Sequence, residues 1–199
     1  MALNLKRLCA GLAALLLALA CQAQEKKWMT LDCLYVADKS NDGDSFLVQC
    51  GRERFFVRLY FVDAPETNMD FPERVRQQYE YFGVTLDELT RTGSTAREYV
   101  QRILASRRFA VHTRKAFAQG RSKHTRYYGL VQVDGRYLHE ILLEEGLARN
   151  RGSAVVLPSG EKAKAHVRAL QVVEDRARAF RKGVWAHHNP STRVLSRPR

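Results

Sequence analysis

The sequence has no internal repeat, no low-complexity block and no apolar run long enough to span a bilayer comfortably. Its longest apolar run extends over 14 residues, from Leu8 to Cys21. The 199 residues contain neither a Gly-x-Ser-x-Gly elbow nor a phosphate-cradling P-loop. These absences argue against a repeat architecture, a serine hydrolase and a P-loop protein.

Cysteine is also scarce. Of four cysteines, Cys9 and Cys21 belong to the N-terminal apolar run, which leaves Cys33 and Cys50 for the folded domain. Two cysteines without a matching histidine or cysteine nearby make a poor zinc site. They flank an expected hairpin, so either a disulfide between them or two buried thiols is compatible with the sequence.

The N-terminal apolar run predicts export. Lys6 and Arg7 precede it and small residues follow it, as in a secretory signal peptide over residues 1–23, cleaved after Ala20 or Ala23. The alternative is a lipoprotein signal that ends before Cys21, which would then carry the lipid and attach the protein to a membrane. We therefore expect a secreted or periplasmic protein, either soluble or lipid-anchored in the envelope.

Acidic residues are few relative to basic ones. There are 21 of Asp and Glu against 33 of Lys and Arg, a formal net charge of +12. Such a surplus favours a polyanionic partner, because basic groups near phosphates release condensed counterions. Nucleic acid is the leading candidate, with an anionic membrane or a cell-wall polymer as alternatives; the charge could also serve only solubility.

Alternating apolar patterns predict five strands, and periodic apolar positions predict several helices. The expected strands are Met29–Val36, Ser45–Cys50, Arg54–Val62, Arg108–Arg114 and Tyr127–Val133. The expected helices begin at Thr85 (stopped by Gly93), Thr95, Leu138 and about Gly160. The order predicts an α+β fold, an OB-fold-type five-stranded β-barrel with about three packed α-helices, over residues 28–186. Residues 187–199 are expected to form a basic flexible tail.

Two acidic segments could carry chemistry. Asp42 and Asp44 flank a glycine in a tight turn, where they could present oxygen atoms to a hard cation such as calcium or could simply form a hairpin turn. Asp63 and Glu66 end the third strand around a proline that fixes their directions. One carboxylate could hold a metal while the other handles a water, or both could be solvated.

Two arginines suit a phosphate-binding role, because guanidinium groups match phosphate oxygens and stay charged. Arg58 lies five residues before Asp63, a spacing that puts the two side chains on opposite faces of an ideal strand. A bulge or the end of the strand must therefore bring them together. Arg126 opens the last expected strand.

Together these pieces resemble the thermonuclease family, typified by staphylococcal nuclease. The resemblance extends from about Leu31 to Trp185. Its motifs are Asp42-Gly-Asp-Ser45, Arg58 with Asp63-x-Pro-Glu-Thr67, Arg126, Asp134-Gly135, Gly146-Leu-Ala148 and Gly183-Val-Trp185. The resemblance implies an exported, calcium-dependent endonuclease that hydrolyses phosphodiester bonds of DNA, and of RNA as a further substrate, to 3′-phosphate products.

The resemblance also implies roles. Asp44, Asp63 and the backbone carbonyl of Ala64 match calcium ligands, and Asp42 matches an acid that tunes the metal site. Glu66 matches the residue that activates or orients the attacking water, and Arg58 and Arg126 match the pair that grips the scissile phosphate. Lys123 and His124 fall in the substrate-binding loop.

The chain departs from the family pattern in two places. The loop Ser122–Arg126 lacks the usual tyrosine and glycine, and the segment from Asn68 to Gly93 is longer than in the prototype. A nuclease-like module that binds nucleic acid or another polyanion without turnover is the alternative function. No protein partner is evident, and we expect a monomer.

Overall fold

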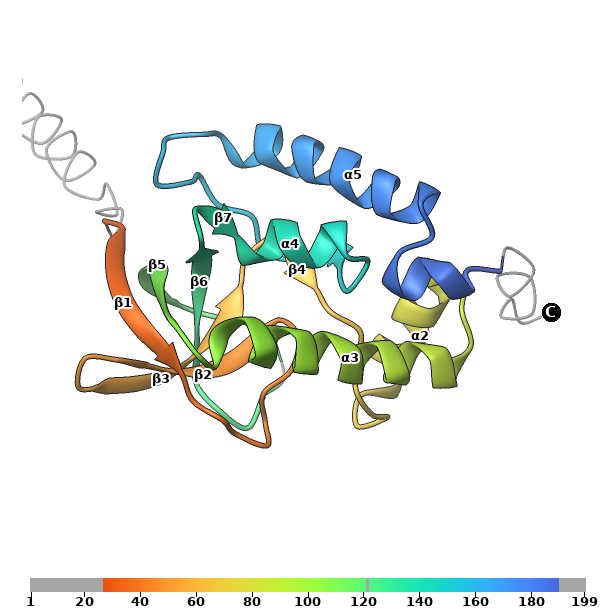
Figure 1. The fold of residues 1–199 in the computed structure, drawn as a ribbon, viewed down its shortest axis with the longest axis horizontal. Helices are drawn as coiled ribbons and strands as arrows, with labels where there is room; N and C mark the ends of the chain where they lie inside the picture. Colours follow the sequence, from red (N-terminus) through yellow and green to blue (C-terminus); the bar gives the residue numbers. More distant parts are fainter. Residues whose placement is uncertain (1–26, 121, 190–199) are drawn as a thin grey trace, which may run out of the picture.

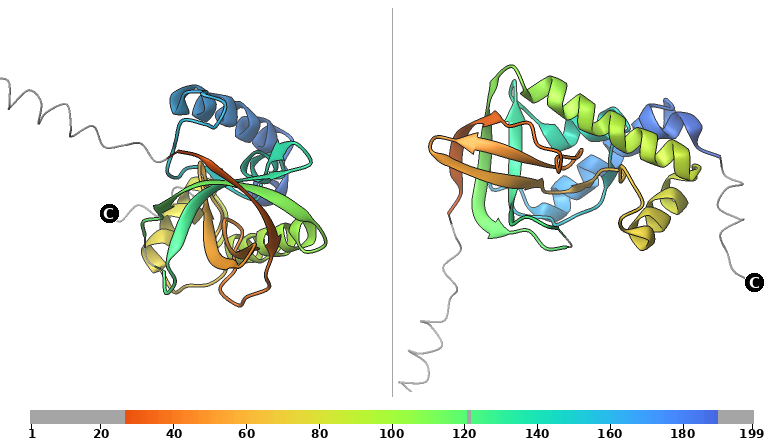
Figure 2. Two further views of the ribbon diagram at one scale, coloured as in Figure 1. Left: turned by 90° about the vertical axis from the view of Figure 1, so that its left-hand side faces the viewer. Right: turned by 90° about the horizontal axis from the view of Figure 1, so that it is seen from below.

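The computed structural model describes residues 27–120 and 122–189. Its strands are β1 (Met29–Tyr35), β2 (Ser45–Cys50), β3 (Glu53–Leu59), β4 (Val62–Asp63), β5 (Arg108–Phe117), β6 (Arg126–Val133), β7 (Arg136–Tyr137) and β8 (Arg149–Asn150). The five long strands form a closed mixed β-barrel (Figure 2). The expected α+β, OB-fold-type barrel is confirmed.

The barrel closes because β3 pairs with strands on both of its edges. The sheet order is β3-β2-β1-β5-β6-β7, and a parallel pairing of β3 with β6 joins its ends, with Phe56 opposite Arg126. In β2 the alternate residues Phe46, Val48 and Cys50 are buried, the period expected of a strand with one face on the core. Cys50 lies opposite Cys33 of β1, and a disulfide joins the two.

Four α-helices accompany the barrel: α2 (Pro72–Phe82), α3 (Leu86–Leu104), α4 (Leu138–Glu144) and α5 (Ala163–Ala179), with the 3-10 helix η1 (Gly183–His187) after them. Helix α3 lies along one side of the molecule, α5 lies over α4, and α2 and η1 lie at the end away from most of the barrel (Figure 1). The sequence pattern missed α2, which occupies the long segment after Asp63. We expected about three helices, and α2 is an additional one.

The expected helix stop at Gly93 was wrong. Helix α3 begins with the predicted capping box of Thr85 and Glu88 and continues through Gly93 to Leu104. A Cβ atom on Gly93 would lie 2.5 Å from the carbonyl oxygen of Glu66 and 2.6 Å from that of Pro65. The glycine is therefore in the helix interior because the backbone of the acidic segment passes directly over it.

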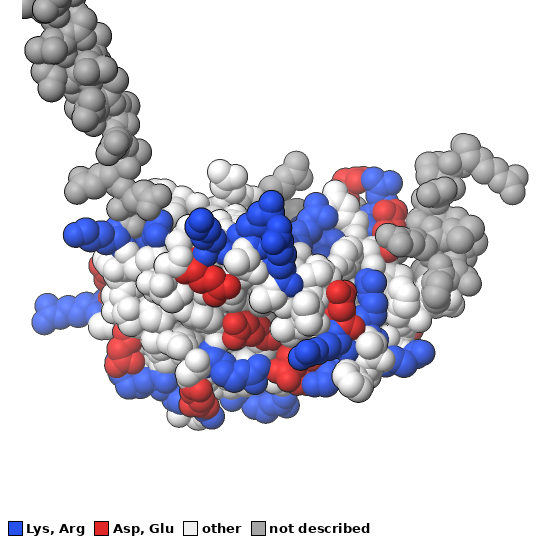
Figure 3. All heavy atoms as spheres, turned by 90° about the horizontal axis from the view of Figure 1, so that it is seen from above, with Lys and Arg blue, Asp and Glu red and all other residues white. Residues whose placement is uncertain are grey.

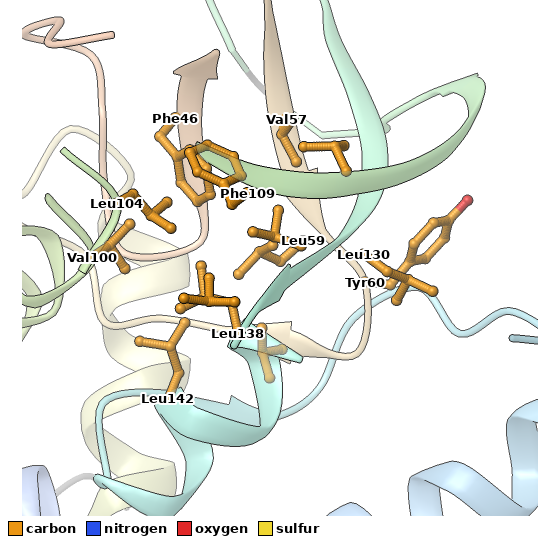
Figure 4. Packing of buried hydrophobic residues seen from close by; sticks show 14 of the residues in the cluster. Phe46, Val57, Leu59, Tyr60, Val100, Leu104, Phe109, Leu130, Leu138 and Leu142 are labelled. Carbon is orange, nitrogen blue, oxygen red and sulfur yellow. The ribbon is translucent and has the colours of Figure 1, made fainter. Parts of the chain in front are cut away.

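Charged side chains of both signs cover the face that carries α5, and basic groups lie beside acidic ones across much of it (Figure 3). Beneath the surface are two apolar cores. The larger core fills the barrel and the space under α3 and α4, with Phe46, Leu59, Leu104 and Leu138 among its buried members (Figure 4).

The second core lies between α2, α3, α5 and η1. Its buried residues are Val75, Phe82, Val84, Leu89, Ala177, Val184 and Trp185. It fixes α2 to the rest of the domain independently of the barrel interior.

The first three residues of the expected tail, 187–189, contact the rest of the domain. His187 ends η1, and the backbone N–H of Asn189 donates to the Gly83 carbonyl at 2.7 Å. The Nδ1 atom of His188 lies 2.5 Å from the Phe82 carbonyl oxygen. Within the described part of the chain, no helix combines the length and apolarity needed to cross a membrane. The expected signal peptide over residues 1–23, Cys21 and residues 190–199 lie outside the described residues.

Candidate functional site

The backbone between β3 and β4 brings the side chains of Arg58 and Asp63 together, although their spacing would place them on opposite faces of an ideal strand. Strand β3 ends at Leu59, and Phe61 adopts a left-handed conformation with φ of 70° before Val62 and Asp63 form β4. Such a conformation is costly for a bulky residue, and here Phe61 is held by burial and by its N–H, which donates to the Ser153 carbonyl. The turn brings Asp63 to 3.1 Å from the guanidinium of Arg58.

The turn before β2 brings a second acid to the same place. A Cβ atom on Gly43 would lie 2.8 Å from the Cβ atoms of both Ala64 and Ala96, so the turn packs tightly against the acidic segment and α3. Asp44 is buried; its Oδ2 accepts from the Ala64 N–H at 2.7 Å and its Oδ1 pairs with Arg58. Asp42 shapes the turn itself, because its Oδ1 accepts from the backbone N–H groups of Asp44 and Ser45.

Both oxygens of Asp63 are engaged. Oδ1 pairs with Arg58 and with the NH2 group of Arg74, at 3.1 and 2.5 Å. Oδ2 accepts from the Gln78 side chain at 3.0 Å and from Arg149 Nε and NH2 at 2.8 and 2.7 Å. The Asp63 side chain is only 8% exposed, so these partners surround it almost completely.

Glu66 lies at the more open side of the cluster, with 18% of its side chain exposed. Its Oε1 pairs with Arg74 Nε at 2.5 Å, and its backbone N–H donates to the Gln78 side chain at 2.8 Å. Burial raises the pKa of the Glu66 carboxyl; Arg74 opposes that effect, and Asp44 and Asp63 add to it. A carboxylate with a raised pKa is suited to accept a proton near neutral pH.

The two aspartates differ in their acid–base balance. Burial opposes ionisation of Asp63, but Arg74, Arg149 and Arg58 outweigh it and lower its pKa to about 2. Burial raises the pKa of Asp44 to about 8; Arg58 and Arg74 oppose that effect, while Asp42 and Asp63 add to it. Asp63 is therefore the firmly ionised member of the pair.

Arg126 lies at the edge of the cluster, on β6. Its NH2 group donates to the Gln119 carbonyl at 3.3 Å, while its Nε is buried and has no hydrogen-bond partner among the described residues. Burial lowers the pKa of Arg126, Arg58 adds to the effect, and Asp42 and Asp44 oppose it, which places all four groups in one electrostatic neighbourhood. This Nε–H is therefore a buried donor whose hydrogen bond is unmet within the described part of the chain.

The loop before Arg126 holds the two expected substrate-binding residues in different ways. The His124 ring stacks on Phe56 with ring centroids 4.5 Å apart, and its Nε2 lies 3.1 Å from the Ser40 hydroxyl. Lys123 is exposed. Both residues are exposed beside Arg126, and the His124 ring also packs on Phe56 of β3.

The residues predicted as metal ligands and catalytic groups converge on one cluster, together with three that the sequence interpretation missed: Arg74, Gln78 and Arg149. Arg74 and Gln78 are four residues apart, so they share one face of α2. Arg149 directly follows the Gly-Leu-Ala motif and pairs through β8 with Asp63 of β4. The four-residue spacing of Arg74 and Gln78 is the feature of the sequence that could have identified these two residues as neighbours on one helix face.

A second buried polar cluster joins α4 and α5. The Nε2 atoms of His139 and His166 lie 2.9 Å apart, the length of an N–H···N hydrogen bond, and Glu140 lies nearby. Burial lowers the pKa of His139 to about 3, and His166 adds to the effect. The Phe61 ring contacts both imidazoles. This pair is separate from the acidic cluster and supports the packing of α5.

A groove of about 540 Å³ lies between α4 and α5, lined by Arg136, Glu140, Glu144, Val173, Arg176, Ala177, Phe180 and Lys182. This groove is separate from the acidic cluster, because no residue of that cluster lines it. The residues predicted as metal ligands and catalytic groups lie in the acidic cluster, so we place the functional site there.

The family model described as staphylococcal nuclease homologue matches residues 56–187, more than half of the chain. The match includes Arg58, Asp63, Glu66 and Arg126 and begins after Asp42 and Asp44. It also includes helix α2. No curated protein matches the chain.

Proposed function

Since the chain belongs to the staphylococcal nuclease homologue family, we propose that it hydrolyses phosphodiester bonds of DNA, and of RNA as a further substrate, at the cluster around Arg58 and Glu66. The observation that carries the proposal is that Arg58 and Glu66 join one cluster through Asp63 and Arg74. Arg126 lies beside this cluster, and its buried Nε–H has no partner among the described residues. A phosphate oxygen would satisfy that donor.

The chemistry follows from the positions of these groups. Arg126 and Arg58 bind the scissile phosphate and stabilise the charge that grows on its oxygens in the transition state. Glu66 accepts a proton from water as the water oxygen attacks phosphorus. The bond from phosphorus to the 5′ oxygen breaks, and the leaving oxygen takes a proton from solvent. The products end in a 3′-phosphate and a 5′-hydroxyl.

Calcium is the metal that the family resemblance implies. The expected donors, Asp44, Asp63 and the Ala64 carbonyl, are oxygen atoms of the type that calcium prefers. However, the carboxylate oxygens accept from arginines, Gln78 or the Ala64 N–H, and the Ala64 carbonyl accepts from the Gln78 side chain at 2.8 Å. In this arrangement the residues do not fit a calcium ion, and the steps above use protein groups alone.

Export is part of the proposal. It is supported by the N-terminal charge and apolar pattern of the sequence and by the disulfide between Cys33 and Cys50, since disulfides persist in oxidising compartments. Labelling cells with a palmitate analogue tests the lipid anchor at Cys21, and a Cys21→Ser variant is the matched control.

The direct test is cleavage of denatured DNA and of single-stranded RNA by the purified chain, with end-group analysis of the products. We expect 3′-phosphate ends, and we expect Glu66→Gln to reduce cleavage by roughly 10²–10⁴-fold, the usual contribution of a general base. Asp70→Asn, an exposed acid in the same segment, is the control and should retain activity. Intact substrate with every metal tested would overturn the proposal.

One observation favours a second candidate, a module that binds nucleic acid without turnover. Arg58 and Arg74, which could contact a substrate, are already paired with internal acids. The two candidates separate in the same assay, because a binding module would shift the DNA in a gel while leaving it intact.

A further inference from the structure

Helix α2 carries two of the groups that occupy the acidic cluster, Arg74 and Gln78. Arg74 bridges two acids, with its NH2 group on Asp63 and its Nε on Glu66, both at 2.5 Å. Gln78, one turn further along, donates to Asp63 and to the Ala64 carbonyl and accepts from the Glu66 N–H. Two side chains of one helix therefore contact Asp63, Ala64 and Glu66, of which the first two are expected calcium ligands.

These contacts neutralise the site. Four carboxylates (Asp42, Asp44, Asp63 and Glu66) share the region with four guanidinium groups (Arg58, Arg74, Arg126 and Arg149). Calcium affinity depends on the number of uncompensated carboxylates and free oxygen ligands. A cluster whose guanidinium groups are at least as numerous as its ionised carboxylates gives a divalent cation little electrostatic reason to bind.

The position of α2 is fixed, so Arg74 is held in place. Pro72 begins the helix and Gly83 ends it in the left-handed conformation, while Val75 and Phe82 are buried in the second core. Gln78 itself is fully buried. A calcium ion would have to displace a guanidinium from a partly desolvated carboxylate, and separating such a pair is costly.

We propose that Arg74, supported by Gln78, takes the place of calcium in this chain by neutralising Asp63 and Glu66, and thereby suppresses calcium binding at the site. The inference rests on the proposed function in taking Asp44, Asp63 and Ala64 as the family's metal ligands. It assigns Arg74 as a positioning residue that holds Glu66 and as the determinant of metal dependence.

The test is calorimetric titration of the full chain with calcium chloride, without substrate. We expect the unaltered protein to bind weakly and Arg74→Gln to bind at least tenfold more tightly. The matched control is Arg76→Gln, which removes the same charge from the same helix and frees the exposed Glu73. It should bind calcium as weakly as the unaltered chain. Equal affinity in the unaltered chain and Arg74→Gln would overturn the inference.

Arg74→Lys is a second variant that tests the inference if Arg74→Gln does not fold. It keeps the charge but loses the planar fork that bridges Asp63 and Glu66, so calcium affinity should rise by an intermediate factor. Circular dichroism and thermal melts establish which variants are folded. If Arg74→Gln is unfolded and Arg74→Lys binds calcium like the unaltered chain, the inference is wrong.

Cleavage assays in parallel, with calcium or with a chelator, separate this inference from the proposed function. Cleavage that persists in chelator supports both. If no form cleaves but Arg74→Gln gains calcium affinity, the proposed function fails and the inference stands. If the unaltered chain cleaves only with calcium and binds it as tightly as Arg74→Gln, the inference fails and the proposed function stands.

Discussion

The two buried polar clusters of this domain keep their groups out of water in opposite ways. Around Asp63 the chain retains full charges and surrounds one carboxylate with Arg58, Arg74 and Arg149. Between α4 and α5 it gives up charge, and His139 shares a hydrogen bond with His166 while burial disfavours its protonated form. A charged cluster must remain complete to be tolerated, whereas a neutral pair can be replaced by apolar groups.

The largest expected effect comes from removing one partner from the charged cluster. Arg149 is 2% exposed and binds Asp63 through two nitrogens. Arg149→Met should lower the free energy of unfolding by about 3–5 kcal/mol, because it leaves a buried carboxylate with less compensation. Urea unfolding at pH 7 measures the loss.

Arg76→Met is the control for this variant, since Arg76 forms an exposed pair with Glu73; it should leave the unfolding free energy nearly unchanged. If both variants lose the same small amount, the charged cluster does not depend on completeness and the comparison fails.

The second largest expected effect is a pH dependence of the free energy of unfolding that arises from the histidine pair between α4 and α5. His139 has a pKa of about 3 in the folded chain and about 6.5 when unfolded. The unfolded state therefore takes up a proton first, so stability is full above pH 6.5 and falls as the pH decreases toward 3. The expected loss approaches about 1.4 kcal/mol per pH unit.

Urea unfolding between pH 7.5 and 4.5 checks this slope. Asp63 contributes to the free energy of unfolding in a different pH range. Its folded pKa of about 2 lies below the ordinary value of 3.8, so its stabilising contribution declines only below about pH 4. Burial also raises the pKa of Asp44, to about 8, which makes stability rise as the pH falls over the same range. The slope that belongs to His139 is therefore the difference between the unaltered chain and the double variant His139→Leu and His166→Leu. Equal slopes for the two proteins between pH 7.5 and 4.5 would contradict the assignment of His139.

The smallest effect should come from replacing the whole histidine pair. The double variant His139→Leu and His166→Leu removes donor and acceptor together, so we expect a change within about 1 kcal/mol at pH 7.5. Its unfolding free energy should also lose the part of the pH slope between 6.5 and 4.5 that belongs to His139. The single variant His139→Leu, which leaves His166 without its partner, should cost more than the double variant.

The sequence predicted the barrel well because its strands alternate clearly and their apolar residues face one interior. It also predicted that the end of β3 must bring Arg58 to Asp63, and the left-handed Phe61 provides that turn. These features depend on local patterns that can be read over a few residues.

Helix α2 could not be predicted in the same way. Its apolar contacts, Val75 and Phe82, pack against Val184 and Trp185, about a hundred residues further along the chain. The predicted helix stop at Gly93 was wrong for a related reason. A glycine is needed there because the carbonyls of Pro65 and Glu66 pass close to it, and these residues are distant from the helix in sequence. The roles of Arg74 and Gln78 depend on this long-range packing, so they became visible only in the folded chain.

The docking of His188 and Asn189 on the end of α2 has a practical consequence. A protein trimmed at residue 186, the boundary expected from sequence, would lose the contacts with the Phe82 and Gly83 carbonyls. Those carbonyls close the helix that presents Arg74 and Gln78 to the acids. The choice of where to end an expressed fragment would thus alter how firmly α2 and the acidic cluster are held, far from where the cut is made in the sequence.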